Sequence, residues 1–312
     1  MNNHEISVKG KILKVPSISI HDSVVVVKGK LIKKAEIFDE YWCESNHLPN
    51  YLTVLEEISQ RSNKPDIFTF TQRIPDTEIR YEYHAEWVNY AVIILNSYDT
   101  WINNQISNAA KRNIKASVKR GVEVRVCEFD NDYVKGIMSI YNETPIRQGR
   151  KFWHYEKCFD AVQAENGTYK SRSTYLGAYY EGEMIGYLKI VWDENSAGIM
   201  QILSKINSYN KRPNDALLAE AVKQCCTRGI KYLIYENFVY GRKAESSLTD
   251  FKRGHGFTKM DVPQYFVPLT LKGFVALRLG LHKSFKEIVP FWLTSRLLNI
   301  RAKCYERSLL KT

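Results

Sequence analysis

The chain has 312 residues, of which 44% are hydrophobic and 12% aromatic, so it can bury sizeable cores and is not intrinsically disordered. This length favours two domains over one. The formal net charge is +11, and residues 271–312 carry nine Lys or Arg against two Glu. A basic surface attracts nucleic acids, anionic lipids and nucleotide phosphates without selecting among them.

Membrane insertion and secretion are not predicted. No run approaches the ~18 consecutive apolar residues of a transmembrane helix, and residues 1–14 lack the apolar core of a signal peptide. The six cysteines are scattered and none forms a C-x-x-C pair. We therefore expect free core thiols, no metal and a cytoplasmic protein.

The first hundred residues alternate between strand and helix patterns. Residues 23–27 form a β-branched run, and residues 66–71 alternate apolar and polar side chains as a half-buried strand does. Helical spacing runs through residues 38–59, where Pro49 is expected to break or start the helix. Residues 91–95 are an apolar strand. The pattern indicates an α/β domain over residues 1–98.

A basic amphipathic helix is predicted over residues 101–120, ending at Gly121. Apolar residues recur every four positions on one stripe, and lysines and arginines cover the rest: Ile102, Ile106, Ala110, Ile114 and Val118 form the stripe. The basic face is either a solvated surface or a surface that meets phosphate or RNA. We take residues 99–121 as a connecting segment.

Residues 122–270 predict a strand, two helices, three strands, a helix, a strand, a helix and a strand. The hairpin around Glu181-Gly182-Glu183 marks the meander of strands. The helix over residues 213–227 begins with Pro213 at its first position, where a missing N–H costs nothing, and Gly229 ends it.

The segment 251–257, Phe-Lys-Arg-Gly-His-Gly-Phe, closes this order of elements. It resembles the last helix of the GNAT N-acyltransferase fold, which usually reads Phe-Tyr-x-x-x-Gly-Phe and whose Tyr can protonate a leaving thiol. Here Lys252 stands where that Tyr would be. The Phe-Lys pair is similar to that of FemAB-like aminoacyltransferases, which are themselves built on GNAT folds.

This resemblance implies the fold and its boundaries. We expect an α/β (α+β) protein with two tandem GNAT-like units, each with a mixed central sheet flanked by helices. The units would be a degenerate one over residues 1–98 and a catalytic one over residues 122–270, joined by the helix of 99–121. A basic helical tail would follow over residues 271–312.

Lys252 is the predicted catalytic residue. Transfer to an amine requires a deprotonated amine, a stabilised oxyanion and a proton for the leaving atom. A lysine whose pKa is lowered by burial, with Arg253 beside it, can serve the last two needs. The alternative is a solvent-facing lysine on a terminal helix, and His255 is expected to pack or cap.

Donor binding is expected at the helix start after residue 209. A GNAT protein binds pyrophosphate here through a Gly-rich loop and a helix N-terminus. In this chain Pro213 removes one donor, Asn214 replaces the first Gly and Asp215 adds negative charge, so a CoA cradle is weakened. The resemblance implies aminoacyl-tRNA as donor instead. The expected donor-binding residues are Lys211, Arg212, Asn214 and Asn237, the alternative being an ordinary helix start.

Acceptor binding is expected in the loop between the first two helices of residues 122–270, which GNAT proteins place over the acceptor site. Arginines can bind phosphate or carboxylate in two-pronged fashion, and aromatic rings can stack on a sugar. A flexible lid with a glycine hinge is one reading, and a packed loop with surface arginines is the other. The expected residues are Arg147, Arg150, Trp153, Tyr155 and, after the fifth strand of this region, Arg242.

The tail from residue 280 mixes apolar and basic residues. A basic amphipathic helix of this kind lies on anionic lipid or docks on its own domain.

Taken together, the residues and the resemblance predict an enzyme that moves an aminoacyl or acyl group onto an amine, and the resemblance implies an anionic cell-envelope precursor as the acceptor. It would have no bound cofactor, and would use aminoacyl-tRNA or acyl-CoA as donor near the membrane. One alternative is an acyl-CoA-dependent N-acyltransferase acting on a small amine or amino sugar. A third is a non-catalytic protein that binds RNA or a membrane surface.

Overall fold

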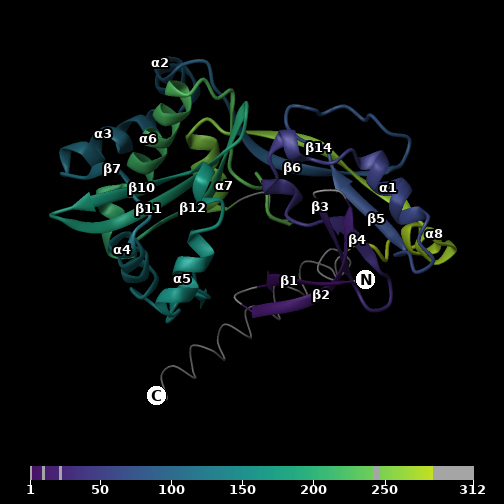
Figure 1. The fold of residues 1–312 in the computed structure, drawn as a ribbon. Coiled ribbons are helices and arrows are strands. Elements are labelled where there is room, and N and C mark those ends of the chain that lie inside the picture. Colours follow the sequence, from purple (N-terminus) through teal and green to yellow (C-terminus); the bar gives the residue numbers. More distant parts are fainter. Residues whose placement is uncertain (1, 9–10, 21–22, 242–245, 284–312) are drawn as a thin grey trace. The chain divides into compact units, whose positions relative to one another are not determined.

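The computed structural model describes residues 2–8, 11–20, 23–241 and 246–283. These residues form two compact units (Figure 1). The first takes the described residues up to 89 together with 260–283, and the second takes residues 90–259. No helix in the described ranges is long and apolar enough to cross a bilayer.

The first unit is built on six strands. Their order is β1 (Asn2–Val8), β2 (Lys11–Ile20), β3 (Ser23–Lys28), β4 (Lys34–Ile37), β5 (Ile67–Thr71) and β14 (Thr258–Pro268). Neighbouring strands are antiparallel except for β4 and β5, which are parallel. Buried Phe68, Phe70 and Tyr265 pack with Val54 and Ile58 of helix α1 (Tyr51–Ser59).

Helix α1 covers only the second half of the predicted range 38–59, and it begins just after Pro49, where the sequence predicted a break or a start. Asn50 caps it, because the Asn50 Oδ1 accepts a hydrogen bond from the Leu52 N–H at 2.9 Å. The preceding residues form two short 3₁₀ turns, η1 (Glu40–Trp42) and η2 (Ser45–His47). Two residues explain why the first half of the range is not α-helical. Asp39 has a left-handed backbone at φ 59°, and Pro49 disfavours a helix that continues through it.

The second unit has a mixed sheet ending in a meander. Its order is the last residues of β6 (His84–Ile94), then β13 (Tyr232–Ile234), β12 (Ser196–Ser204), β11 (Glu183–Trp192), β10 (Ser173–Tyr180) and β7 (Glu123–Cys127). Only the β12–β13 pair is parallel among these neighbours within the described chain.

Both faces of this sheet are covered. The alternation of β10 sends Leu176 and Ala178 into the core shared with α6 (Pro213–Thr227) and α3 (Asn108–Lys119). Tyr175 faces the other core, which α4 (Asn131–Tyr141) and α5 (Phe159–Asn166) build. The sheet is therefore sandwiched between two helical layers (Figure 1).

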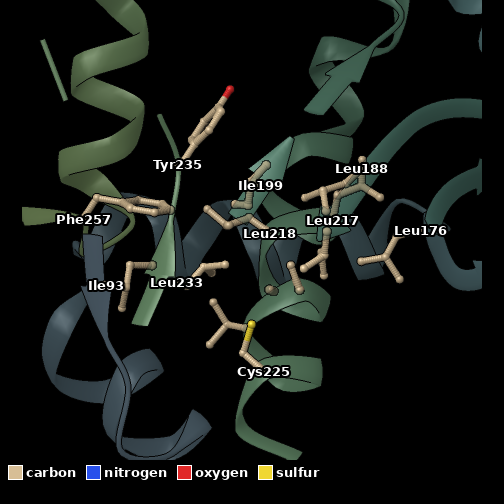
Figure 2. Packing of buried hydrophobic residues seen from close by; sticks show 14 of the residues in the cluster. Ile93, Leu176, Leu188, Ile199, Leu217, Leu218, Cys225, Leu233, Tyr235 and Phe257 are labelled. Carbon is tan, nitrogen blue, oxygen red and sulfur yellow. The ribbon is translucent and has the colours of Figure 1, made fainter. Parts of the chain in front are cut away.

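Helix α6 is the most deeply buried of the described helices. It begins at Pro213, as the sequence predicted, and Leu217, Leu218 and Cys225 pack against Ile199 and Leu233 of the sheet (Figure 2). Apolar residues on all sides of a helix are typical of a core position. Because the helix is held so firmly, its first turn is a fixed element.

The basic helix expected over residues 101–120 is interrupted, and the prediction of one continuous helix was wrong. The chain forms α2 (Tyr98–Thr100), a π-helical turn η3 (Trp101–Gln105), and then α3. Ile106 is extended, and the Ser107 hydroxyl caps α3 by accepting from the Ala110 N–H at 3.1 Å. Trp101 is buried and donates from its Nε1 to the His255 carbonyl at 3.0 Å, which fixes the turn.

The two compact units also differ from the boundaries expected at residues 98, 122 and 270. Residues 90–121 belong to the second unit, where Ala91 and Ile93 join the core around α6. Residues 260–283 return to the first unit, because Gln264–Pro268 of β14 pair with β5. Of the expected tail, only 271–283 lie inside the described residues, and they contain helix α8 (Leu271–Arg278).

Candidate functional site

A cavity of about 520 Å³ opens in the second unit where two parallel strands part. Strands β12 and β13 pair over three positions, from Ser196 with Tyr232 to Gly198 with Ile234. Beyond them β13 ends, while β12 continues to Ser204. The cavity is bordered by the far end of β12, the start of α6 and helix α7 (Ser247–Gly254), together with three residues outside these elements, Gln148, Tyr209 and Tyr235. The full lining is Gln148, Ile202, Leu203, Ser204, Tyr209, Arg212, Pro213, Asn214, Asp215, Tyr235, Ser247, Leu248 and Phe251.

The start of α6 supplies polar groups to this cavity. Arg212 is left-handed at φ 61° and Pro213 follows at the first helical position, and the N–H groups of a first helical turn have no acceptor within the helix. Two residues that border the cavity, Asn214 and Ser204, each have a buried side-chain oxygen (Oδ1 and Oγ) with no hydrogen-bond partner among the described residues. Buried polar atoms are costly when unpaired, so this end of the cavity suits a ligand or water with polar groups.

Asp215 also borders the cavity, and its carboxylate contacts a buried histidine. Its Oδ1 lies 3.1 Å from His255 Nε2, and His255 Nδ1 lies 2.8 Å from the Phe251 carbonyl oxygen. Both Asp215 and His255 are buried. His255 therefore packs, as the sequence predicted, and joins the start of α6 to helix α7. The Asp215 carboxylate therefore already has a polar partner inside the protein.

Lys252 is completely buried, which rules out the solvent-facing alternative. Its Nζ donates to the carbonyl oxygens of Tyr235 and Asn237, each at 2.7 Å, and lies 4.1 Å from the centroid of the Tyr235 ring. Burial lowers the pKa of Lys252 to about 8, against the opposing charge of Glu236. Lys252 itself does not border the cavity, whereas Tyr235 and Phe251 do.

The four expected donor-binding residues have different positions. Arg212 and Asn214 border the cavity together. Lys211 instead places its Nζ 3.4 Å from the centroid of the Tyr180 ring. Asn237 contributes its backbone carbonyl to Lys252. The structure thus brings two of the four to the cavity, and their binding role stays a prediction.

The expected acceptor loop is a tight hairpin. Strands β8 (Ile146–Arg147) and β9 (Arg150–Lys151) pair with each other, and Gln148 and Gly149 between them are both left-handed, at φ 51° and 67°. Gln148, at the tip, borders the cavity. The glycine therefore serves the turn geometry of the hairpin.

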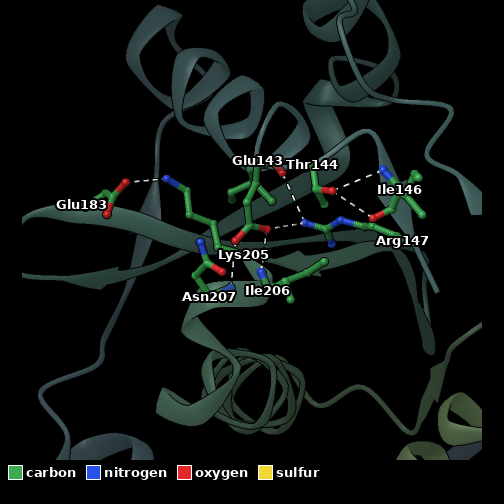
Figure 3. Close-up of polar contacts among 9 residues, drawn as sticks. Glu143, Thr144, Ile146, Arg147, Glu183, Lys205, Ile206 and Asn207 are labelled. Carbon is green, nitrogen blue, oxygen red and sulfur yellow. Dashed lines mark hydrogen bonds and ion pairs between the residues drawn. The ribbon is translucent and has the colours of Figure 1, made fainter. Parts of the chain in front are cut away.

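Arg147 is held inside the protein by Glu143. The Arg147 Nη2 lies 3.2 Å from Glu143 Oε2, and the guanidinium lies over the Phe152 ring. The Glu143 carboxylate also accepts from the Ile206 N–H at 2.6 Å and the Asn207 N–H at 2.8 Å (Figure 3). These two amides open the 3₁₀ turn η5 (Ile206–Lys211) that leads into α6. The Glu143 carboxylate thus connects the β8–β9 hairpin to the η5 turn that precedes helix α6.

The remaining expected acceptor residues lie further along the loop. Arg150 is exposed. Trp153 is half exposed, with Lys157 Nζ 3.6 Å from its ring centroid, and Tyr155 packs on the core formed by α4 and α5. None of these three borders the cavity. Arg242 lies outside the described residues.

Sequence reasoning did not identify Ser204, Gln148 or Tyr235 as cavity residues. Ser204 was visible as the polar residue that ends an apolar strand, next to a loop that leads into a helix. No sequence pattern marks Gln148, because its position depends on the contacts of Glu143 with Arg147 and with the Ile206 and Asn207 amides. Glu143 lies seventy residues before the start of α6 in the sequence. We call these contacts the Glu143 clamp.

One group of metal-ligating side chains occurs among the described residues, and it lies in the first unit. Ligand atoms of His84, Glu86 and His282 fall within 4.8 Å of one another. Lys283 Nζ lies 3.0 Å from the same Glu86 oxygen that His282 Nε2 approaches at 2.8 Å. The Glu86 carboxylate is therefore already paired with a cationic and a polar side chain.

Comparison with known proteins gives structural likeness alone. No family model matches the chain, and no curated protein matches it in sequence. Among solved structures, FemX is similar over 89% of this chain and 90% of its own, with a TM-score of 0.55 and 9% identity. The C-terminal domain of a putative lysylphosphatidylglycerol synthetase from Agrobacterium fabrum covers 85% and 87%, with a TM-score of 0.56 and 10% identity.

A third likeness agrees with these two. L-PGS from Bacillus licheniformis is similar over 82% of this chain and 85% of its own, with a TM-score of 0.51 and 12% identity. The chain therefore shares the α/β fold of these three structures, as the Phe251-Lys252 segment and the order of elements implied.

Proposed function

We propose that this protein is a transferase that moves an aminoacyl or acyl group onto an amine. The observation that carries the proposal is the cavity between the diverging ends of β12 and β13, beneath the first turn of α6. Apolar walls from Ile202, Leu203 and Leu248 suit the body of an acyl group, and the polar end at Ser204 and Asn214 suits its carbonyl and amide groups.

The α6 first turn is the proposed electrostatic element of the reaction. Attack by an amine on an acyl carbonyl places negative charge on the carbonyl oxygen, and free N–H groups at a helix start stabilise such charge. Asp215 does not oppose this, because it is directed at His255. The fixed position of α6 keeps these donors aligned before the substrate arrives.

Lys252 acts, in this proposal, through its neighbours. Its ammonium holds the carbonyl groups of Tyr235 and Asn237 and lies beside the Tyr235 ring that borders the cavity. We assign Lys252 as a positioning residue that holds Tyr235 in place at the border of the cavity. The direct catalytic role expected from the sequence remains the competing prediction, and both are tested below.

Aminoacyl-tRNA is the first proposed donor, supported by the fold shared with FemX and with lysylphosphatidylglycerol synthetase domains. Acyl-CoA is the second candidate, because exposed Arg212 and the α6 first turn border the cavity and suit a pyrophosphate. We propose an anionic cell-envelope precursor bearing an amine as acceptor, with the enzyme working in the cytoplasm.

The test incubates the purified protein with labelled aminoacyl-tRNA or acyl-CoA pools and a panel of amines, and follows label transfer. We expect transfer from one pool, and its loss when Ser204→Leu fills the polar end of the cavity. Retention of RNA without transfer from either pool would refute the proposal and favour a binding protein.

A second buried lysine provides the control for Lys252. Lys189 is also fully buried, and its Nζ donates to the Asn166 carbonyl at 2.9 Å, but it does not border the cavity. Lys252→Met should lower turnover at least tenfold more than Lys189→Met. If Lys252 only positions Tyr235, Lys252→Arg should recover part of the turnover and leave the dependence of turnover on pH unchanged. If Lys252 is catalytic, Lys252→Arg should recover no turnover and the pH dependence should change. Equal losses in both methionine variants would remove Lys252 from the mechanism.

A further inference from the structure

Helix α3 of the second unit has an outer side on which every charged group is a cation. Residues 100–122 contain five Lys or Arg and no Asp or Glu. Arg112, Lys115 and Lys119 are exposed and recur at helical spacing, so they lie on one side of the helix. At a rise of ~1.5 Å per residue, this side carries positive charge along about 10 Å.

The inner side of α3 fixes this orientation. Ala110 and Ser117 are the buried residues of the helix, and Ile114 packs against the core around α6. Helices α3 and α6 lie side by side (Figure 1). The cations on the opposite side of α3 are therefore directed to solvent.

Acidic side chains do not neutralise this charge. Among the described residues, no ion pair involves a cation of residues 111–120. Glu123, the next acid along the chain, pairs instead with Arg125 at 2.5 Å. Like charges four residues apart, such as Lys115 and Lys119, are unfavourable in a helix unless an anion lies against them. The outer side of α3 therefore has charge available for a polyanion.

The C-terminal end of α3 connects this charge to the cavity. Arg120 donates from its Nη1 to the Asn210 carbonyl oxygen. Asn210 belongs to η5, which leads into α6, and exposed Arg212 at the start of α6 borders the cavity. Lys211 lies between them in the chain. We define the α3 basic strip as Arg112, Lys115, Lys119, Arg120, Lys211 and Arg212.

The length and polarity of the α3 basic strip discriminate among polyanions. The pyrophosphate of an acyl-CoA is compact, so Arg212 and the first turn of α6 suffice to meet it without α3. A helix that lies on a bilayer exposes several large apolar side chains, whereas Val118 is the only large hydrophobic residue exposed in the described α3. An RNA strand presents successive phosphates, which a row of Lys and Arg neutralises. The strip therefore fits RNA best.

We propose that the α3 basic strip binds the phosphate backbone of an RNA strand whose acylated end enters the cavity beside Arg212. This inference rests on the transferase function proposed above, and it favours an RNA-borne acyl donor over acyl-CoA. The cations of α3 position the strand without reading its bases, because contacts to phosphate carry no sequence information.

The test measures binding of a deacylated tRNA pool to the full chain by fluorescence anisotropy over a series of salt concentrations. We expect the logarithm of the association constant to fall linearly with the logarithm of the salt concentration. The strip variant, Lys115→Gln with Lys119→Gln, should bind about tenfold more weakly near physiological salt. The salt slope should decrease in magnitude by about 1.5, because two phosphate contacts are lost.

A matched control removes the same charge elsewhere in the second unit. Lys135 is exposed on α4, and exposed Lys170 donates to the carbonyl of Phe129, which packs on the core formed by α4 and α5. This core lies on the other face of the sheet from α3. Lys135→Gln with Lys170→Gln should therefore bind RNA like the wild type.

Label transfer separates this inference from the proposed function. With aminoacyl-tRNA as donor, the strip variant should raise KM about tenfold and keep kcat near the wild-type value, because the strip binds the donor and does not touch the reacting atoms. RNA binding that depends on the strip, without transfer from either pool, would support the strip and refute the transferase. Transfer from acyl-CoA by a protein that binds no RNA would refute the strip alone.

Three other results would overturn the inference. These are no RNA binding by the wild type, equal losses in the strip variant and the control, or full RNA binding by the strip variant. If the strip variant kept RNA binding but lost binding to vesicles containing phosphatidylglycerol, the strip would be assigned to lipid. An unchanged melting temperature shows that both variants fold, since the replaced lysines are exposed.

Discussion

The clamp made by Glu143 gives the sharpest prediction. Its side chain is only 9% exposed and pairs with Arg147, which is 10% exposed, while its two oxygens accept from the Ile206 and Asn207 amides. In Glu143→Gln one acceptor oxygen becomes an N–H donor that faces other donors, and the buried guanidinium loses its counter-charge.

The magnitude follows from these contacts. Breaking a buried ion pair costs about 3–5 kcal/mol, and a hydrogen bond to a charged group contributes about 1.5–3 kcal/mol. Because glutamine keeps one acceptor, we expect a loss of about 3 kcal/mol in the free energy of unfolding of the second unit. For a unit of this size the melting temperature should fall by about 6–12 °C.

Glu183 provides the control. It is 62% exposed and pairs with Lys205 a few residues from the same clamp (Figure 3). An exposed pair contributes about 0–1 kcal/mol, so Glu183→Gln should barely change the melting temperature. Calorimetry measures both variants, and amide hydrogen exchange at Ile206 and Asn207 should speed up in Glu143→Gln alone. Equal effects of the two variants would refute the clamp.

Two further predictions concern the first unit. Burial raises the pKa of Glu40 to about 7, so folded Glu40 keeps a proton that the unfolded chain loses near pH 4.5, and its ionisation costs stability as the pH rises through this range. Glu40→Gln should therefore raise the urea midpoint at pH 8 but leave it unchanged at pH 4; the reverse order would contradict burial as the cause. Gly273→Ala should lower the stability of this unit by about 3 kcal/mol, because its Cβ would meet the Asp66 carbonyl. Gly254→Ala, whose Cβ would make only an ordinary contact with Ser107, should cost less than 1 kcal/mol in the same thermal melt, and similar losses would argue against the close seat of α8.

Local patterns predicted much of the fold. The strand at 23–27, the hairpin through Gly182 and the helix from Pro213 were all readable because alternation, turn residues and an N-terminal proline act over a few positions. Apolar spacing alone failed for residues 101–120. There the contact of Trp101 with the His255 carbonyl, 154 residues away, interrupts a helix that the local pattern supports.

The candidate site was readable only in part. The start of α6 was found at Arg212 and Asn214, because a helix start has a local signature. The environment of Lys252 could not be predicted, because its hydrogen-bond acceptors are backbone carbonyl groups, which every residue has. Contacts to a distant backbone carbonyl do not require a particular residue type at the acceptor position, so they cannot be recognised in the sequence.

The clamp at Glu143 also bears on how an acceptor would be selected. The β8–β9 hairpin is connected to the η5 turn through two backbone amides, so we expect it to be rigid and not to open and close as a lid. A molecule that binds beside Gln148 would then meet a rim of preset shape, and discrimination between amines would come from fit against that rim.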